Sequence, residues 1–216
     1  QAGVEDIAIV ERADDVGGTW RDNTYPGVAC DIPTMLYSFS FARNPAWSRM
    51  YPSGGEIRQH IEDLTHQHGL RRLIRFGTEV TGLSFAEDTG VWTATTNGRR
   101  KICARTVVLA SGPLADHSLP DIRGIETYKG TKIHSASWDH GFDVTGKRIG
   151  VIGTGDHGSR EALFLRSYSP DITLLSLTGE SLDATEQDEA RIAGVTVIPE
   201  PVSGFDFDDD TLTLTL

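Results

Sequence analysis

The segment Gly153-Thr154-Gly155-Asp156-His157-Gly158 constrains the fold more than any other part of the chain. Its flanks predict an apolar strand at residues 149–152, a helix around residues 161–165 and a strand at residues 172–175. This order is typical of a Rossmann-like α/β unit, in which the glycines allow a tight turn, the approach of a pyrophosphate and close helix packing. The alternative is a structural turn. The candidate nucleotide-binding residues here are Gly153, Thr154, Gly155 and Gly158.

A second such unit is indicated near the beginning, where residues 6–11 predict a buried strand of a parallel sheet that ends in Glu11. An acid at this place accepts hydrogen bonds from the ribose of a dinucleotide, although a charge that simply leaves a strand for solvent is the alternative. Only five residues precede Asp6. We therefore expect either a segment of a longer protein or a first site without its pyrophosphate loop.

The remaining pattern predicts three parts of one α/β chain. A helix is expected at residues 56–68, closed by Gly69, and then a meander of β-prone stretches at residues 73–85, 91–96 and 102–109, with residues 107–110 returning to the buried sheet. The tail at residues 211–216 is also β-prone. We expect a partial first domain at residues 1–113, a connector at residues 114–146 and a partial second domain at residues 147–216.

Residues 17–37 hold the densest group of glycine and aromatic residues. Gly17 and Gly18 allow backbone to approach a flat or charged ligand, while Trp20, Tyr25 and Tyr37 offer aromatic faces with polar groups. Asp31 is an isolated acid among them. The alternative is a glycine-rich turn with aromatic core residues and a capping Asp.

Two stretches resemble the fingerprints of flavin-dependent Baeyer–Villiger and related flavin-containing monooxygenases. Residues 17–31 match Gly-Gly-x-Trp-x4-Tyr-Pro-Gly-x3-Asp at every specified position. Residues 128–139 resemble Phe-x-Gly-x3-His-x3-Trp-(Pro/Asp), with Tyr128 in place of Phe. The resemblance covers residues 1–158 and implies two Rossmann-like domains, the first for FAD and the second for NADP or NAD. It further implies FAD contacts from Glu11, Gly18, Thr19, Trp20, Asp31, Tyr37, Val80 and Ala110.

The same resemblance implies an enzyme that inserts one oxygen of O2 into a small-molecule ketone, or oxidises a heteroatom, through a flavin peroxide after reduction by NAD(P)H. Asp31 has a catalytic role in this comparison, because it would hold an Arg that places charge near the flavin. That Arg has no counterpart in the sequence.

From Asp156 onward the chain looks more like thioredoxin-reductase-type flavoproteins, but residues 135–138 lack their Cys-x-x-Cys, which excludes dithiol chemistry. The strand at residues 172–175 is followed by no Lys or Arg, so we expect no strong preference for the 2′-phosphate of NADPH. We also expect no acid at this strand end for a free ribose hydroxyl, which leaves Ser176 as the local candidate.

Composition and charge exclude several classes of function. The net charge is −11, and residues 167–216 hold 11 acids against Arg191 alone, so no basic surface is expected for nucleic acid. No long apolar stretch or leader is present, which predicts a cytoplasmic protein without membrane contact. Cys30 and Cys103 are expected to be reduced core residues, and no metal site is expected. The oligomeric state is not indicated.

Three functions remain open at this stage. The leading one is the flavin monooxygenase. A second is a thiol-free reductase related to thioredoxin reductase, whose flavin passes electrons to another acceptor. The third is a non-catalytic nucleotide-binding remnant, which would carry no yellow cofactor.

Overall fold

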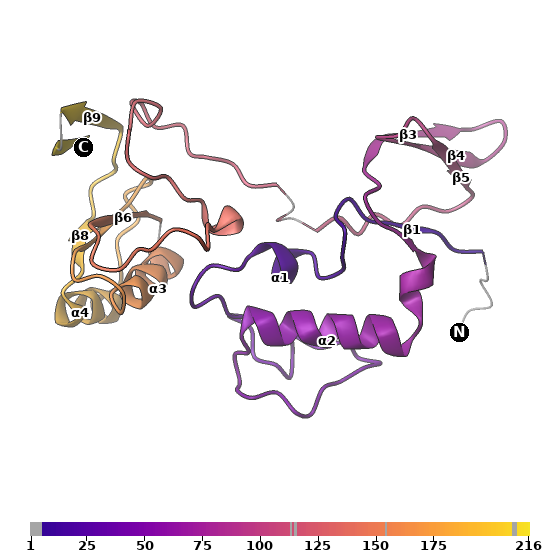
Figure 1. Cartoon of the computed structure of the whole chain (residues 1–216), viewed down its shortest axis with the longest axis horizontal. Helices are drawn as coiled ribbons and strands as arrows, with labels where there is room; N and C mark the ends of the chain where they lie inside the picture. The colour runs from indigo at the N-terminus through magenta and orange to yellow at the C-terminus, as the bar shows by residue number, and fades with distance from the viewer. Residues whose placement is uncertain (1–5, 113, 115, 154, 209–210) are drawn as a thin grey trace. The chain divides into compact units, whose positions relative to one another are not determined.

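The computed structural model describes residues 6–112, 114, 116–153, 155–208 and 211–216, which Figure 1 traces along the chain. The chain divides into two compact units. The first comprises Gln1–Thr24 and Ala29–Asp116, and the second comprises Tyr25–Val28 and His117–Leu216. The four residues Tyr25–Val28 therefore belong with the C-terminal half, although their neighbours in sequence belong to the first unit.

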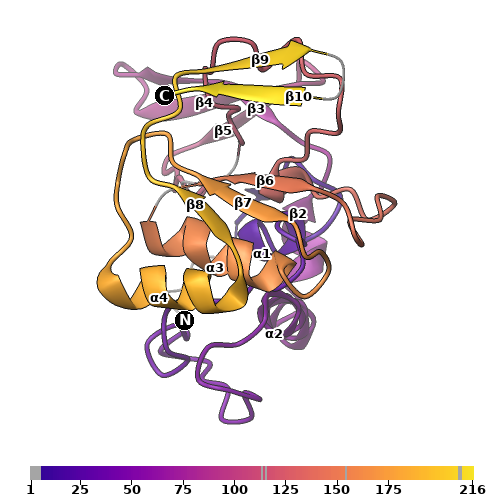
Figure 2. The same cartoon turned by 90° about the vertical axis from the view of Figure 1, so that its left-hand side faces the viewer.

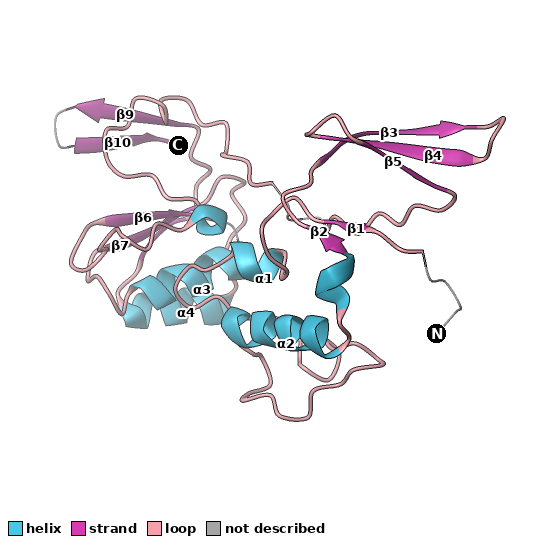
Figure 3. Cartoon of the chain, turned by 45° about the vertical axis from the view of Figure 1, so that its right-hand side comes forward, coloured by secondary structure: helices cyan, strands magenta, loops and turns pink. Residues whose placement is uncertain are grey.

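The first unit combines a short parallel sheet, an antiparallel meander and helices (Figure 3). The elements are β1 (Ile9–Val10), α1 (Thr19–Asp22), α2 (Gly54–Gln67), η1 (Leu70–Leu73), β2 (Ile74–Arg75), β3 (Val80–Ala86), β4 (Val91–Thr96) and β5 (Lys101–Ala104). Strand β1 joins a parallel sheet, as the sequence predicted, but its partner β2 belongs to the stretch that the sequence assigned to the meander. The expectation that this first strand is buried is wrong, because a two-stranded sheet leaves its faces open and Ile7 and Ile9 stay exposed.

Helix α2 confirms the predicted helix and begins two residues earlier than expected. The reason is Ser53, whose side chain accepts a hydrogen bond from the backbone N–H of Glu56 and so caps the first turn. Ile57 is buried on one face of the helix. Gly69 follows the helix with a φ of +59°, a left-handed conformation that stops helices at low cost.

The meander is confirmed, with β3, β4 and β5 antiparallel in that order. The single stretch expected at residues 73–85 is split into β2 and β3 by a turn in which Gly77 has a φ of +60°. The expected return of residues 107–110 to a buried sheet is wrong. Val108 and Leu109 are 83% and 79% exposed and pair with no strand in the described part of the chain, so their apolar composition has no ladder to join.

The second unit is built on a parallel sheet in the order β6-β7-β8 (Figure 2). Its elements are η2 (Ser135–Ser137), β6 (Ile149–Ile152), α3 (Gly155–Leu165), β7 (Ile172–Leu175), α4 (Ala184–Ala193), β8 (Thr196–Ile198), β9 (Gly204–Asp208) and β10 (Thr211–Thr215). Figure 2 shows α3 and α4 on the same face of the sheet, the arrangement of consecutive right-handed β-α-β units. The predicted Rossmann-like strand, loop, helix and strand are confirmed.

The core of this unit lies between the helices and the sheet. Ala162 is fully buried on α3, and Ile172 and Leu174 of β7 are 1% and 4% exposed. A small residue on the helix and branched residues on the strand allow the two layers to pack closely. The packing holds the end of β6 and the start of α3 in fixed positions.

Helix α4 was missed at the sequence level, although its signal is present. Asp183 and Glu186 form a reciprocal capping box at its first turn, and Gly194 ends it with a φ of +75°. The helix is strongly acidic and only Ala190 is buried, so apolar periodicity did not reveal it.

The two cysteines have different environments. Both thiols are free, and Cys30 is buried as expected. The expectation for Cys103 is wrong, because strand β5 carries it on an exposed face of the meander. The β-prone tail is confirmed as β10, which pairs antiparallel with β9.

Candidate functional site

The glycine loop between β6 and α3 is built by close backbone approach. A Cβ placed on Gly153 would lie 2.9 Å from the Cα of Gly158, so neither position has room for a side chain. Gly155 begins α3 with a φ of +53°. The first turn of a helix presents unpaired N–H groups, which bind phosphate. The structure thus brings together Gly153, Gly155 and Gly158, while Thr154 lies outside the described residues.

A tight turn follows β7, the strand next to this loop. Ser176 is buried, and its hydroxyl oxygen accepts a 3.0 Å hydrogen bond from the N–H of Gly179. The residue after that turn is Glu180, and a Cβ on Gly155 would lie 3.5 Å from both of its carboxylate oxygens. The strand end itself carries no acid, and the structure instead brings the carboxylate of Glu180 to the loop from the turn that follows the strand.

In the first unit, the paired glycines form a turn beside Glu11. Gly17 and Gly18 have φ values of +119° and +49°, which side-chain-bearing residues rarely adopt. Arg21 of α1 lies 3.6 Å from the Glu11 carboxylate, which also accepts a 2.8 Å hydrogen bond from the N–H of Ala13. The turn, the short helix with Thr19 and Trp20, and the acid at the end of β1 are thus brought together.

Two aromatic candidates in this unit contact each other. The indole Nε1–H of Trp20 donates a 2.9 Å hydrogen bond to the hydroxyl of Tyr37, and the rings meet edge to face with centroids 5.7 Å apart. The contact joins α1 to the loop that follows Asp31. Of the three aromatic candidates at residues 17–37, Trp20 and Tyr37 are thus brought together, whereas Tyr25 belongs to the second unit.

The remaining candidates of this unit are less connected. Asp31 is exposed next to Cys30, the pKa of whose thiol is raised mainly by burial. Val80 begins β3, and Ala110 lies outside any helix or strand. Among the described residues, no hydrogen bond or ion pair links Asp31, Val80 or Ala110 to another candidate.

The second fingerprint forms a turn centred on His134. Its Nδ1 accepts a 3.1 Å hydrogen bond from the N–H of Ala136 at the start of η2, and its ring lies against that of His117, with centroids 4.7 Å apart. Burial, followed by the nearby His117, lowers the pKa of His134. Trp138 packs against the core of the second unit. The fingerprint thus fixes the connector onto this unit.

The structure also reveals a carboxylate that the sequence analysis missed. Glu161 of α3 is partly buried and forms a hydrogen bond with Tyr25, whose segment belongs to the same unit. Burial raises the pKa of Glu161, while Tyr25 and His157 act in the opposite direction. A Cβ on Gly27 would lie 2.8 Å from the ring of Phe164. The Tyr-Pro-Gly part of the first fingerprint therefore packs on α3.

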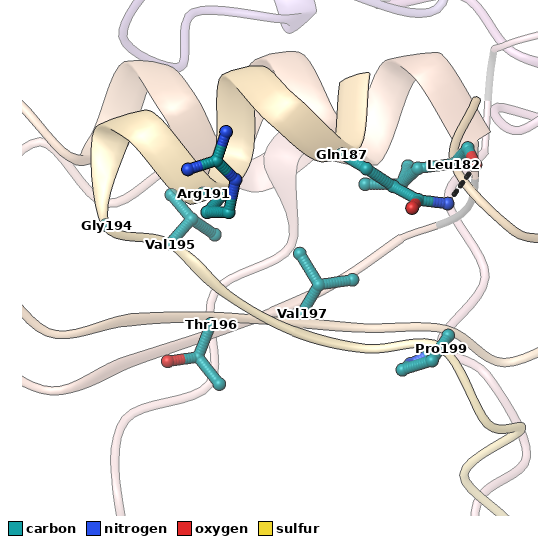
Figure 4. Close-up of a pocket in the computed structure, with 8 residues that line it drawn as sticks. All are labelled: Leu182, Gln187, Arg191, Gly194, Val195, Thr196, Val197 and Pro199. Atoms are coloured by element: carbon teal, nitrogen blue, oxygen red, sulfur yellow. Dashed lines mark hydrogen bonds between the residues drawn. The ribbon is translucent and has the colours of Figure 1, made fainter. Parts of the chain in front are cut away.

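A groove of about 490 Å³ runs between α4 and β8 (Figure 4). Its lining residues are Leu182, Gln187, Arg191, Gly194, Val195, Thr196, Val197 and Pro199. Figure 4 shows the Gln187 amide turned to the carbonyl of Leu182, to which it donates a 2.7 Å hydrogen bond. None of the described glycine-loop residues lines this groove, so it is separate from the part of the candidate nucleotide site that the structure describes.

Comparison with known proteins decides the family. A family model described as flavin-binding monooxygenase-like matches residues 2–182. The chain belongs to this family. It is 46% identical over 175 residues to a Baeyer-Villiger monooxygenase of Streptomyces coelicolor, covering 81% of this chain and 33% of the relative. It is 39% identical over 177 residues to another from Pseudomonas aeruginosa, covering 82% and 33%. The chain spans about a third of the length of these curated relatives.

Solved structures of flavin-binding monooxygenase-like proteins agree in fold. Cyclohexanone monooxygenase from Rhodococcus sp. Phi1, a mutant bound to NADP+, matches with a TM-score of 0.71 and 37% identity, covering 78% of this chain and 33% of that one. An oxidised steroid monooxygenase bound to NADP matches with a TM-score of 0.70 and 33% identity, covering 86% and 38%. The partial Rossmann-like fold expected from the sequence is confirmed.

The described residues contain neither a candidate metal cluster nor a membrane-spanning helix. No cluster of three or more His, Cys, Asp or Glu side chains in them could hold a metal ion. No helix among them has the length and apolar character needed to span a membrane.

Proposed function

We propose that this chain is the cofactor-binding part of an FAD-dependent monooxygenase that uses NAD(P)H and O2. The observation that carries the proposal is the β6-loop-α3 unit, whose glycines leave room for a pyrophosphate, in a chain that belongs to the flavin-binding monooxygenase-like family. The FAD-binding domain would comprise residues 1–113, the connector residues 114–146 and the NAD(P)-binding domain residues 147–216.

The first domain offers a group of residues that fits FAD. Glu11 is held by the N–H of Ala13 and by Arg21, so its carboxylate is oriented for a ribose hydroxyl. The positive φ angles of Gly17 and Gly18 bring bare backbone to the start of α1. We propose that the FAD contacts come from Glu11, Gly18, Thr19, Trp20, Asp31, Tyr37, Val80 and Ala110.

The second domain offers a phosphate site with a different geometry. Gly153 and Gly158 are too close for side chains, and α3 starts at Gly155, so its first N–H groups are available for the pyrophosphate of a nicotinamide dinucleotide. Thr154 is proposed as part of the same loop from the sequence alone.

FAD, when bound, supplies the redox chemistry and the activation of O2. The residues of this chain bind and orient it. The Trp20–Tyr37 hydrogen bond fixes one wall of the proposed flavin site, and Asp31, which is exposed, is available to hold a cation near the reacting ring. A small ketone or a heteroatom compound is the proposed substrate, in line with relatives named Baeyer-Villiger, cyclohexanone and steroid monooxygenase.

The test is oxygen transfer. The whole monooxygenase, of which this chain would be the cofactor-binding part, is expected to be yellow when purified, to consume O2 with NAD(P)H in the presence of a ketone, and to place one labelled oxygen atom from O2 in the product. Oxidation of NAD(P)H by an artificial acceptor without labelled product would favour the thiol-free reductase. Colourless protein that still binds dinucleotide would favour the non-catalytic remnant. A cytoplasmic location and the absence of nucleic-acid partners stay predictions.

A further inference from the structure

The feature that carries a further inference is the position of Glu180 beside the glycine loop. A Cβ on Gly155 would lie 3.5 Å from both carboxylate oxygens of Glu180. Gly155 is the second glycine of the loop, where a bound pyrophosphate comes closest to the backbone. The ribose attached to that pyrophosphate extends toward the end of the neighbouring strand, β7, which precedes the turn that carries Glu180.

The turn that positions Glu180 is fixed on three sides. The Ser176 hydroxyl oxygen accepts a 3.0 Å hydrogen bond from the N–H of Gly179. The backbone carbonyl of Ser176 accepts a 2.9 Å hydrogen bond from the N–H of Val202. Gly179 has a φ of +70°, and a Cβ there would lie 2.8 Å from the ring of Pro201. The Ser176 side chain is therefore part of the turn, and Glu180 is the group that the turn presents.

The Glu180 carboxylate is exposed and accepts no hydrogen bond from any described residue. It stands 22 residues after Gly158, close to the spacing of about 20 residues at which dinucleotide folds place the acid that binds the ribose 2′-hydroxyl. Resting on the proposed nucleotide function, we infer that Glu180 accepts the 2′-hydroxyl of NAD(H) and selects against the 2′-phosphate of NADP(H). This differs from the neighbours described as bound to NADP.

The charge around the site supports the same selectivity. A 2′-phosphate carries about two negative charges and would meet a carboxylate within a few ångströms, which is repulsive even in a medium like water. Residues 176–183 contain no Lys or Arg. Four other cations of this unit are engaged elsewhere. These are Lys132 with the carbonyls of Ile125 and Tyr128, Lys147 over the ring of Phe142, Arg148 with Asp171, and Arg191 with Asp188.

The test is the equilibrium binding of NADH and NADPH to the purified protein, measured by calorimetry without turnover. NADH is expected to bind at least about tenfold more tightly than NADPH. Glu180→Gln should narrow this ratio to about threefold or less, and Glu180→Arg should invert it by tightening NADPH. Glu189→Gln, which removes an exposed charge from α4, is the matched control and should leave the ratio unchanged.

The variants separate the two proposals. Equal or tighter binding of NADPH by the unaltered protein would overturn the role of Glu180 and leave the nucleotide site standing. Binding of neither dinucleotide would overturn both. Because Glu180→Arg is expected to gain affinity for NADPH, misfolding cannot produce the supporting result, and failure to gain it in a variant with unchanged circular dichroism would contradict the inference.

Discussion

The indole Nε1–H of Trp20 donates a 2.9 Å hydrogen bond to the hydroxyl oxygen of Tyr37. The two residues are 17 positions apart, one on the four-residue helix α1 and the other in the loop after Asp31. A helix of one turn has little stability of its own, so a contact of this kind fixes its orientation. Both residues match positions that the family resemblance assigns to FAD contacts.

The contact predicts a measurable coupling between the two side chains. In a double-mutant cycle with Trp20→Phe and Tyr37→Phe, the interaction free energy is expected to be about 0.5–1 kcal/mol, because the bond is made near solvent and water replaces part of it. Urea unfolding of the four proteins gives this value. Tyr51→Phe, at another exposed tyrosine, is the control. An interaction near zero would show that the bond fixes nothing.

The glycine loop predicts that an alanine substitution is far more damaging at Gly153 than at Gly150, three residues earlier. Gly153→Ala would place a Cβ 2.9 Å from the Cα of Gly158, and the resulting shift of backbone should cost about 1–3 kcal/mol and abolish dinucleotide binding. Gly150→Ala in β6 is the matched control, since its Cβ would meet Leu175 at an ordinary 3.7 Å. Thermal unfolding and NADH titration check both effects. Flavin content should stay unchanged in each variant, because the first unit is untouched.

A substitution at Gly155 separates binding from folding. Gly155→Val would meet a left-handed φ of +53° and would bring its side chain against Glu180. In the whole monooxygenase, we expect slower reduction of the flavin by NADH with normal flavin content, measured by stopped-flow absorbance. Parallel loss of both would mean that the loop supports the fold and does not bind the nicotinamide dinucleotide.

The sequence predicted elements well where a local pattern and its neighbours agreed. Residues 149–152 and 172–175 form strands at the expected bounds because each is an apolar run with a partner strand. Residues 107–110 have the same composition, yet they pair with no described strand and stay exposed. The composition of a segment indicates its tendency to form a strand. Whether it pairs depends on a partner strand elsewhere in the chain, whose position the local sequence does not give.

The candidate site shows the same limit. The glycine motif located the loop directly, because its spacing is a local requirement of the backbone. Glu180 was not predicted because it lies beyond the end of the strand in sequence, and only the turn from Ser176 to Gly179 returns it to the loop. Glu161 was missed because its partner, Tyr25, lies far away in sequence.

The environment of His134 predicts a pH dependence of stability. Burial lowers its pKa, its Nδ1 is an acceptor for Ala136, and the imidazole of His117 faces it. Since the unfolded chain holds the proton more tightly, the free energy of unfolding should fall as the pH drops below about 6.5 and keep falling until the folded pKa is passed. Urea unfolding at intervals of about one pH unit, from about pH 5 to about pH 8, measures this change in the free energy of unfolding. His134→Asn, which keeps an acceptor near Nδ1, should flatten the curve, whereas His66→Asn on α2 should not.

Glu161 predicts a dependence of the opposite sign in the same unit. Its pKa is raised, chiefly by burial, so the folded protein holds this proton more tightly than the unfolded chain. The proton on Glu161 therefore contributes fully to the free energy of unfolding below the ordinary pKa of a glutamate, about 4.3. This contribution is lost as the pH rises through the pKa of Glu161 in the folded protein. Glu161→Gln should remove this loss and leave the protein relatively more stable at neutral pH.

Tyr25→Phe should raise the pKa of Glu161 further, because the hydrogen bond from Tyr25 lowers it. Carbon-13 titration of the carboxyl group checks both statements, and a Glu161 pKa at or below the ordinary value would refute them.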